Sequence, residues 1–166
     1  IEARGLNTLK LQTMWSTNGV PNQAYYDGVW ELGEDEALII ETPVPERCGY
    51  WNIQLADMLF CGIDMINRQT SLNGFQARLD TDGLFRAVLS SRDPGVPNWL
   101  DAGGKTKGSI VGRWKEASSS PEPTVRKVKV NDVRQYLPGD TPQVSVSERE
   151  ELLRRRRRAS QLRRRG

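Results

Sequence analysis

The sequence predicts an all-β domain, an antiparallel β-sandwich of jelly-roll type, followed by a C-terminal arginine-rich helix. Three observations lead to this prediction. Short segments alternate apolar and polar residues, glycine and proline recur between these segments, and arginine is concentrated at one end of the chain. The 166 residues include 15 glycines and 9 prolines but only 3 phenylalanines. This composition favours many short strands joined by turns over a bundle of helices.

The charge distribution divides the chain into two parts. Residues 147–166 carry nine arginines against three glutamates, a net charge of +6, whereas residues 1–146 carry a net charge of −3. We therefore expect a sandwich domain over residues 1–146 and a basic helix over 147–166. A chain of this length suits a single core. The basic tail has no aromatic residue to stack on bases, so nucleic acid is an unfavoured partner.

Alternation of apolar and polar residues predicts the strands of the first half. They cover residues 8–15, 24–32, 37–41 and 50–55. The short segment Gly33-Glu34-Asp35 between the second and third strands predicts a hairpin. Pro43 and Pro45 end the third strand, because proline cannot donate to a ladder.

The second half predicts a second hairpin and two further strands. Residues 75–79 and 84–90 alternate on either side of Thr81-Asp82-Gly83, which is the clearest hairpin pattern in the sequence. Residues 92–104 are too rich in proline and glycine for regular structure, and long loops of this kind often carry function. Residues 109–115 and 125–130 are expected strands, separated by a short linker.

The end of the chain predicts a helix over residues 148–164. Ser147 and Glu150 have the spacing of a capping box, and good helix formers follow. Its apolar side is thin, so we expect docking along a narrow seam at most. That side consists of Leu152, Leu153, Ala159 and Leu162. A solvated helix is the simplest interpretation, and binding of an anionic partner or of a neighbouring subunit's acidic surface are the alternatives.

Four segments resemble a bacterial family catalogued as domain of unknown function 1214. They are Gly49–Leu55, Asn67–Gly74, Asp93–Asp101 and Gly112–Trp114, and the similarity extends from about Tyr25 to Leu137. The resemblance implies a jelly-roll-like sandwich at the C-terminal end of a longer protein, often preceded by a second domain of similar architecture. It implies no settled activity.

Several common chemistries have no support in the sequence. The chain has no histidine, which is the usual general base and the commonest metal ligand. Cys48 and Cys61 flank an expected strand and should be too far apart for a disulfide. Asp80 and Asp82 resemble the start of a calcium loop, but the remaining ligands are missing. There is no phosphate-binding glycine motif. We therefore expect no metal and no cofactor.

The sequence shows no signal peptide and no apolar segment that could span a membrane. A cytoplasmic location is the expectation for the residues given, although a fragment could have lost a leader.

Two loops concentrate polar side chains at strand ends, where sandwich loops often form binding sites. The candidate ligand-binding residues are Asn67, Arg68, Ser71, Asn73, Arg92, Asn98 and Trp99. Asp93 and Asp101 are candidate catalytic carboxylates, because a pair of acids can hydrolyse a glycosidic bond. The structural alternatives are that Asp93 caps the Pro94-Gly95 turn, that Asn73 forms a turn with Gly74, and that Trp99 closes the sandwich. The other tryptophans, at 15, 30, 51 and 114, are expected in the core.

Three functions are compatible with these observations. The first is a module that binds a small molecule or saccharide and supports a preceding domain of the same polypeptide. The second is a hydrolase that uses Asp93, Asp101 or a region outside this fragment. The third is a structural role in assembling a homo-oligomer.

Overall fold

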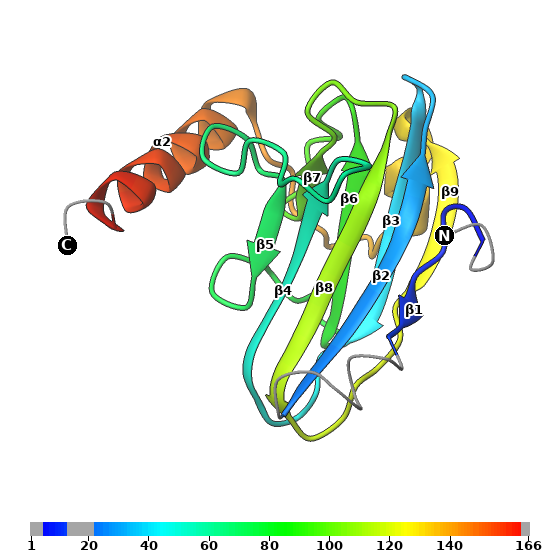
Figure 1. The fold of residues 1–166 in the computed structure, drawn as a ribbon. Helices are drawn as coiled ribbons and strands as arrows, with labels where there is room; N and C mark the ends of the chain where they lie inside the picture. The colour runs from blue at the N-terminus through cyan, green and yellow to red at the C-terminus, as the bar shows by residue number, and fades with distance from the viewer. Residues whose placement is uncertain (1–4, 13–21, 164–166) are drawn as a thin grey trace.

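The computed structural model describes residues 5–12 and 22–163, and their strands form two sheets with a helix at the C-terminal end (Figure 1). The β-rich prediction with a C-terminal helix is therefore confirmed. The first sheet has the order β1-β2-β8-β4-β5, and the second has the order β7-β6-β3-β9. The strands are β1 (Lys10–Leu11), β2 (Gln23–Glu31), β3 (Glu36–Pro43), β4 (Cys48–Ala56), β5 (Ser71–Asn73), β6 (Leu84–Ser90), β7 (Trp99–Asp101), β8 (Lys107–Ala117) and β9 (Thr124–Lys129). The 3-10 helix η2 covers Val130–Tyr136, and α2 covers Val146–Arg163.

Side chains from both sheets meet in one core. The expected tryptophans Trp30, Trp51 and Trp114 are all buried there, together with Tyr26 of β2 and Phe85 of β6. Trp51 packs edge-on against Phe85 at 4.8 Å between ring centroids, so aromatic contacts join the two sheets. Trp15 lies outside the described residues.

A second apolar cluster covers the outer face of the second sheet. Val130 and Val133 of η2 pack with Val96 and Trp99 against Ala37, Ile39 and Val88. The sequence did not predict η2. Its packing explains why residues on both faces of β3 are buried, and it places Trp99 on the side of the sheet away from the main core.

The predicted hairpin over 24–32 and 37–41 is wrong. β2 belongs to the first sheet and β3 to the second. The Gly33 turn exists, with Glu36 N–H donating to Gly33 O at 3.1 Å, but it carries the chain from one sheet to the other. The reason is that β1 and β8 pair with the two edges of β2, so neither is left for β3.

The predicted hairpin over 75–79 and 84–90 is also wrong in its first strand. Residues 74–76 form a turn, residues 77 and 78 have no regular structure, and Phe75 is 91% exposed. The turn itself is present, because Gly83 N–H donates to Asp80 O at 2.9 Å, and an isolated bridge joins Leu79 to Phe85. β6 pairs with β3 along one edge, and β7 takes the other edge from Val88 onward. Only the single Leu79–Phe85 bridge therefore forms where the sequence predicted a full strand.

Two smaller expectations also change, and a third, that Cys48 and Cys61 form no disulfide, is confirmed. The strand over 8–15 is only β1 within the described residues, and the residues from 13 onward lie outside them. The 92–104 loop contains β7, which pairs in parallel with β6. Both cysteines are free. In the described part of the chain, no helix is long and apolar enough to span a membrane.

Candidate functional site

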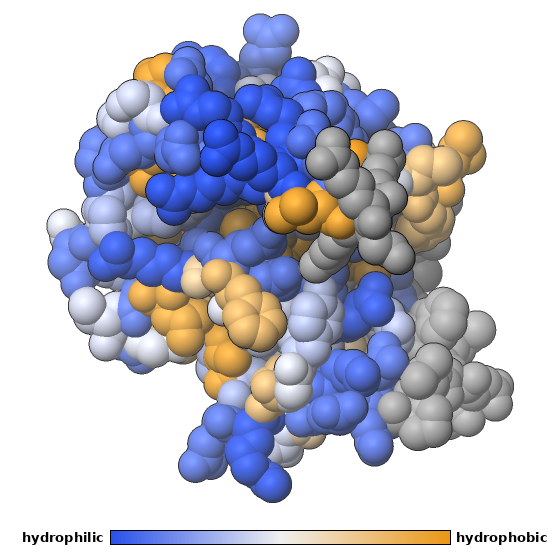
Figure 2. All heavy atoms as spheres, turned by 90° about the vertical axis from the view of Figure 1, so that its left-hand side faces the viewer, coloured by the Kyte–Doolittle hydropathy of each residue, from blue (hydrophilic) through white to orange (hydrophobic). Residues whose placement is uncertain are grey.

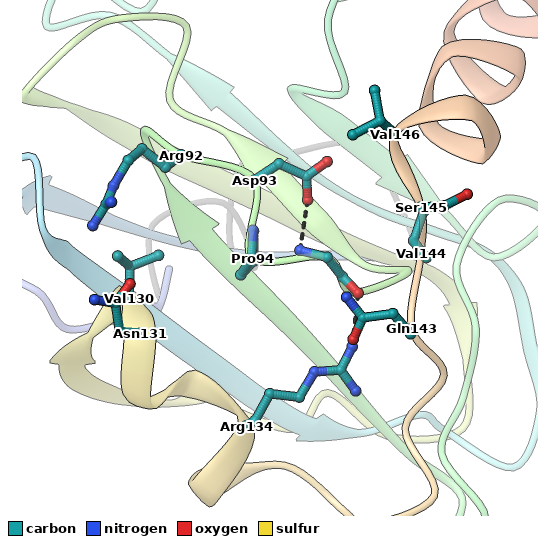
Figure 3. Close-up of a pocket in the computed structure, with 11 residues that line it drawn as sticks. Arg92, Asp93, Pro94, Val130, Asn131, Arg134, Gln143, Val144, Ser145 and Val146 are labelled. Carbon is teal, nitrogen blue, oxygen red and sulfur yellow. Dashed lines mark hydrogen bonds between the residues drawn. The ribbon is translucent and has the colours of Figure 1, made fainter.

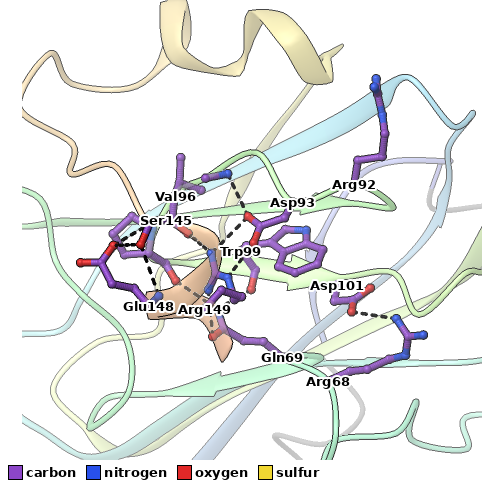
Figure 4. Close-up of polar contacts among 12 residues, drawn as sticks. Arg68, Gln69, Arg92, Asp93, Val96, Trp99, Asp101, Ser145, Glu148 and Arg149 are labelled. Carbon is purple, nitrogen blue, oxygen red and sulfur yellow. Dashed lines mark hydrogen bonds and ion pairs between the residues drawn. The ribbon is translucent and has the colours of Figure 1, made fainter. Parts of the chain in front are cut away.

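The C-terminal helix attaches to the two sheets through a buried arginine. Arg149 of α2 is only 5% exposed and lies between the two loops that the sequence singled out (Figure 4). Its Nε donates to Asp93 Oδ2 at 2.8 Å and its Nη2 to Asp93 Oδ1 at 3.2 Å. Nη1 reaches Gln69 Oε1 at 3.2 Å, and Nη2 also donates to Val96 O at 2.5 Å.

The face of the Arg149 guanidinium is also covered. It lies 5.2 Å from the centroid of the Trp99 ring, within the range of a cation–π interaction. A buried guanidinium is tolerated only when its charge and its donors are compensated, and Asp93, Gln69 and Val96 supply that compensation. Asp93 and Trp99, two candidate site residues, therefore hold the helix in place.

A second arginine on the same side of α2 contacts the other loop. Arg156 follows Arg149 by seven residues, or about two helical turns. Its Nε donates to Met65 O at 2.5 Å, its Nη1 to Ser71 O at 3.0 Å, and its Nη2 bonds the Ser71 hydroxyl. Burial lowers the pKa of the Arg156 guanidinium. The candidate residue Ser71 thus also binds the helix.

The expected leucine seam is wrong. Of its four residues only Leu153 is half-buried, whereas Leu152 and Ala159 are exposed and Leu162 is 70% exposed. The helix docks through Arg149 and Arg156 because the surface it meets offers carbonyl, carboxylate and amide oxygens. Figure 1 shows α2 extending away from the sheets, in keeping with this narrow attachment.

The capping box lies two residues earlier than expected. Ser145 N–H donates to Glu148 Oε2 at 2.8 Å, and Glu148 N–H donates to Ser145 Oγ at 3.3 Å. Hydrogen bonds from the Ser145 hydroxyl and N–H lower the pKa of Glu148. These hydrogen bonds fix the start of α2 directly after Gln143 and Val144.

Asp101 is buried and paired within the protein. Arg68 Nη1 donates to Asp101 Oδ2 at 2.9 Å, and Gly103 N–H donates to its Oδ1 at 2.8 Å. Asp93 Oδ1 accepts from Gly95 N–H at 2.8 Å in addition to its bonds with Arg149. The candidate acids therefore each have both oxygens engaged.

The candidate amide residues and Trp99 make structural contacts. Asn98 accepts from Arg78 N–H at 2.9 Å and donates to Arg78 O and Arg86 O at 2.6 and 2.8 Å. Trp99 Nε1 donates to Ser90 O and to Ser90 Oγ, both at 3.1 Å.

Asn67 and Asn73 act locally. Asn67 bonds the Asp64 carboxylate through its N–H and side chain, which lowers the pKa of Asp64. Asn73 Oδ1 accepts from Phe75 N–H at 3.0 Å and forms a turn. Both side chains stabilise the loops in which they lie.

Beside Asp93 the surface is hollowed by a cavity of about 510 Å³ (Figure 3). Residues of the 92–95 loop, η2 and the segment before α2 line it, among them Arg92, Asn131, Arg134 and Gln143. Arg134 donates to Gly95 O and Thr141 O, both at 2.7 Å, and so fixes one wall. The Arg92 side chain makes no hydrogen bond or ion pair to the described residues, although it interacts electrostatically with Asp35. Figure 3 places it across the hollow from Gln143.

The sequence identified Arg92 but missed Asn131, Arg134 and Gln143. These residues follow the last expected strand, where the sequence shows no periodicity to indicate a wall. Within residues 5–12 and 22–163, no group of three or more cysteine or acidic side chains is placed to hold a metal ion.

No model of a known protein family matches the chain, and no curated protein matches it. Several solved structures are similar to the chain, among them the following two. The first, an uncharacterized protein from Burkholderia cenocepacia, is 34% identical over 75% of this chain, with a TM-score of 0.71. The second, a protein from Vibrio parahaemolyticus, is 18% identical over 69% of this chain, with a TM-score of 0.52. The chain spans about a third of each, 36% and 33% of their lengths, and neither description indicates a function.

Proposed function

We propose that the chain is a ligand-binding module of a larger protein, and that the hollow beside Asp93 takes a small anionic molecule such as a carboxylate or an acidic saccharide. One observation carries this proposal. The unpaired guanidinium of Arg92 shares an open cavity of about 510 Å³ with Arg134 and with the amides of Asn131 and Gln143. Guanidinium and amide groups of this kind bind carboxylate oxygens well.

The charge balance of the hollow favours an anion. Arg92 and Arg134 are positive, and Asp93 is the one carboxylate among the described residues that line it. Both Asp93 oxygens already accept hydrogen bonds, and Arg149 compensates its charge. Asp35 interacts electrostatically with Arg92 but forms its ion pair with Lys129, so an incoming carboxylate would still meet net positive charge from Arg92 and Arg134.

The hydrolase alternative has no supporting observation. Asp93 binds Arg149 and Asp101 binds Arg68, so each candidate acid already serves a structural contact. A binding module needs neither carboxylate to be free.

The proposal also covers the sandwich topology of the domain and its place in a longer protein. We infer a jelly-roll-type sandwich of the family resembled by the four sequence segments, with a preceding domain as its partner. The shared core of the two sheets supports the sandwich. The length of the Burkholderia relative, of which this chain spans 36%, supports the larger protein.

Titration calorimetry tests the binding proposal. Glucuronate should bind, and neutral glucose should bind at least tenfold more weakly, because only glucuronate can form charge-assisted bonds, each contributing roughly 1.5–3 kcal/mol. Arg92→Gln should weaken glucuronate binding by about tenfold or more. Acetate and succinate extend the test to carboxylates without a sugar ring.

Arg47→Gln is the matched control, because Arg47 is exposed, makes no side-chain hydrogen bond to the described residues and does not line the hollow. It should leave binding unchanged. Equal affinity for glucose and glucuronate, unchanged affinity in Arg92→Gln, or no carboxylate binding at millimolar concentration would each reject the proposal.

A further inference from the structure

A short loop after β4 holds two apolar side chains out in solvent. The Asp57 carboxylate accepts from Leu59 N–H at 2.8 Å and from Cys61 N–H at 2.9 Å. Asp57 N–H donates to Cys61 O at 2.9 Å, and Phe60 N–H donates to Asp57 O at 3.1 Å. Four hydrogen bonds within five residues fix this tip, yet Leu59 is 83% exposed and Phe60 is 57% exposed.

The backbone of the tip is also strained. Phe60 has φ of 62°, in the left-handed region that bulky residues rarely adopt. Such strain is typically retained where a position has a role, because glycine would adopt the same conformation without cost. The loop therefore retains an aromatic side chain at a position where a smaller residue would fold more easily.

A second tip presents another aromatic residue. Phe75 is 91% exposed, and the turn that carries it is fixed by Asn73, whose Oδ1 accepts from Phe75 N–H and Gln76 N–H at 3.0 and 3.1 Å. Gly74 packs against the Trp51 ring, which leaves no room for a Cβ. Phe75 is thus exposed on a well-anchored turn.

The two tips flank the segment that binds α2. Arg156 bonds Met65 and Ser71, which lie in the chain between the two tips. Figure 2, which faces the side where α2 projects in Figure 1, shows apolar side chains beneath a hydrophilic band at the height of α2. We call this surface the tip-and-helix face: Met58, Leu59, Phe60, Met65, Phe75 and the arginines of α2.

The helix adds positive charge to the tip-and-helix face. Residues 146–163 contain seven arginines and three glutamates. Arg149 and Arg156 are used in docking, and Arg154 and Arg155 pair with glutamates on the helix. Arg157 and Arg158 make no ion pair or hydrogen bond to the described residues, so their charge is available to a partner.

We propose that the tip-and-helix face binds the surface of an anionic phospholipid membrane. Projecting apolar side chains beside a cluster of arginines match an interface with hydrocarbon beneath and negative head groups above. The arginines on this surface favour a membrane over a protein partner, because the centres of protein–protein interfaces contain few charged residues. This inference uses residues other than those of the hollow and stands independently of the proposed function.

Vesicle flotation tests the inference. The chain should float with vesicles of phosphatidylcholine containing about a quarter phosphatidylglycerol, should bind pure phosphatidylcholine at least about tenfold more weakly, and should be released by salt. The triple variant Leu59→Ser, Phe60→Gly, Phe75→Ser should reduce partitioning about tenfold. Arg157→Gln with Arg158→Gln should reduce it by a similar factor.

Each control removes the same type of side chain, exposed apolar or exposed basic, from a surface outside the tip-and-helix face. Leu6→Ser removes an exposed leucine at the other edge of the first sheet, and Arg47→Gln with Lys105→Gln removes two exposed charges. Both should float like the unmodified chain, and every variant should keep its melting temperature. No flotation, equal binding to neutral vesicles, loss in the controls, or a dimer in light scattering that the triple variant dissociates would each overturn the proposal.

Discussion

Arg149 and Asp93, 56 residues apart in sequence, form a two-point ion pair that joins the C-terminal helix to the loop after β6. The pair lies against Trp99 and accounts for the full burial of one arginine within a largely exposed arginine-rich segment. Asp93 also closes the Gly95 turn. One carboxylate thus fixes both the loop and the helix beside the hollow.

Replacing Arg149 with alanine should destabilise the chain by about 2–4 kcal/mol, because it leaves Asp93, Gln69 and the Val96 carbonyl without their donor. Urea unfolding measures the loss, and circular dichroism should show a loss of helix before the sheets unfold. Arg155→Ala is the control, since this side chain is 72% exposed, and it should stay within about 0.5 kcal/mol. Equal stability of the two variants would contradict the docking role of Arg149.

Replacing Asn98 with alanine should cost about 2–3 kcal/mol, because three hydrogen bonds to the backbone of residues 78 and 86 are lost from a buried site. The exposed Asn67→Ala is the control and should cost under about 1 kcal/mol. Carboxylate affinity of the folded Asn98 variant should equal that of the unmodified chain. A variant of normal stability that fails to bind would show that Asn98 contacts ligand instead.

Asp82 should contribute to acid sensitivity. Hydrogen bonds from Arg86 and from Leu84 N–H lower the pKa of Asp82. A carboxylate whose pKa is lower in the folded state than in the unfolded state stabilises the fold at pH values above its unfolded-state pKa. This stabilisation is lost as the pH falls through the folded-state pKa. The loss should begin below about pH 4. Urea unfolding at several pH values should show that Asp82→Asn loses less stability on acidification than the unmodified chain.

Asp140→Asn is the control for that experiment, because Asp140 is exposed and its side chain makes no hydrogen bond to the described residues. Its acid dependence should follow the unmodified chain. Identical curves for Asp82→Asn and the unmodified chain would mean that the Arg86 pair contributes nothing to acid stability.

Gly112 of β8 should not accept a side chain. A Cβ at this position would collide with the ring of Tyr26, which is fully buried in the main core. Gly112→Ala should therefore cost about 1–3 kcal/mol or more. Gly33→Ala is the control, since a Cβ there meets only ordinary contacts, the nearest at 3.5 Å. Thermal unfolding distinguishes the two, and a tolerated Gly112→Ala would require the Tyr26 ring to move.

Local patterns predicted most strands because alternation depends on neighbouring residues. Trp51, Ile53 and Leu55 are buried as expected, and β6 covers the Leu84–Ser90 segment that alternation indicated. Pairing depends instead on which edges are free. The turns at Gly33 and Gly83 resemble hairpin turns, but the longest pairings of β2 and β6 are with the distant strands β8 and β3.

The candidate site shows the same division. Loop composition identified Arg92 and Asp93, and charge identified an arginine-rich helix. Only the tertiary structure brought Arg149 and Arg156 onto Gln69, Ser71 and Asp93, because these contacts join residues 56 to 85 positions apart. Composition records how many charges a segment has, whereas folding decides which are buried, paired or left free for a partner.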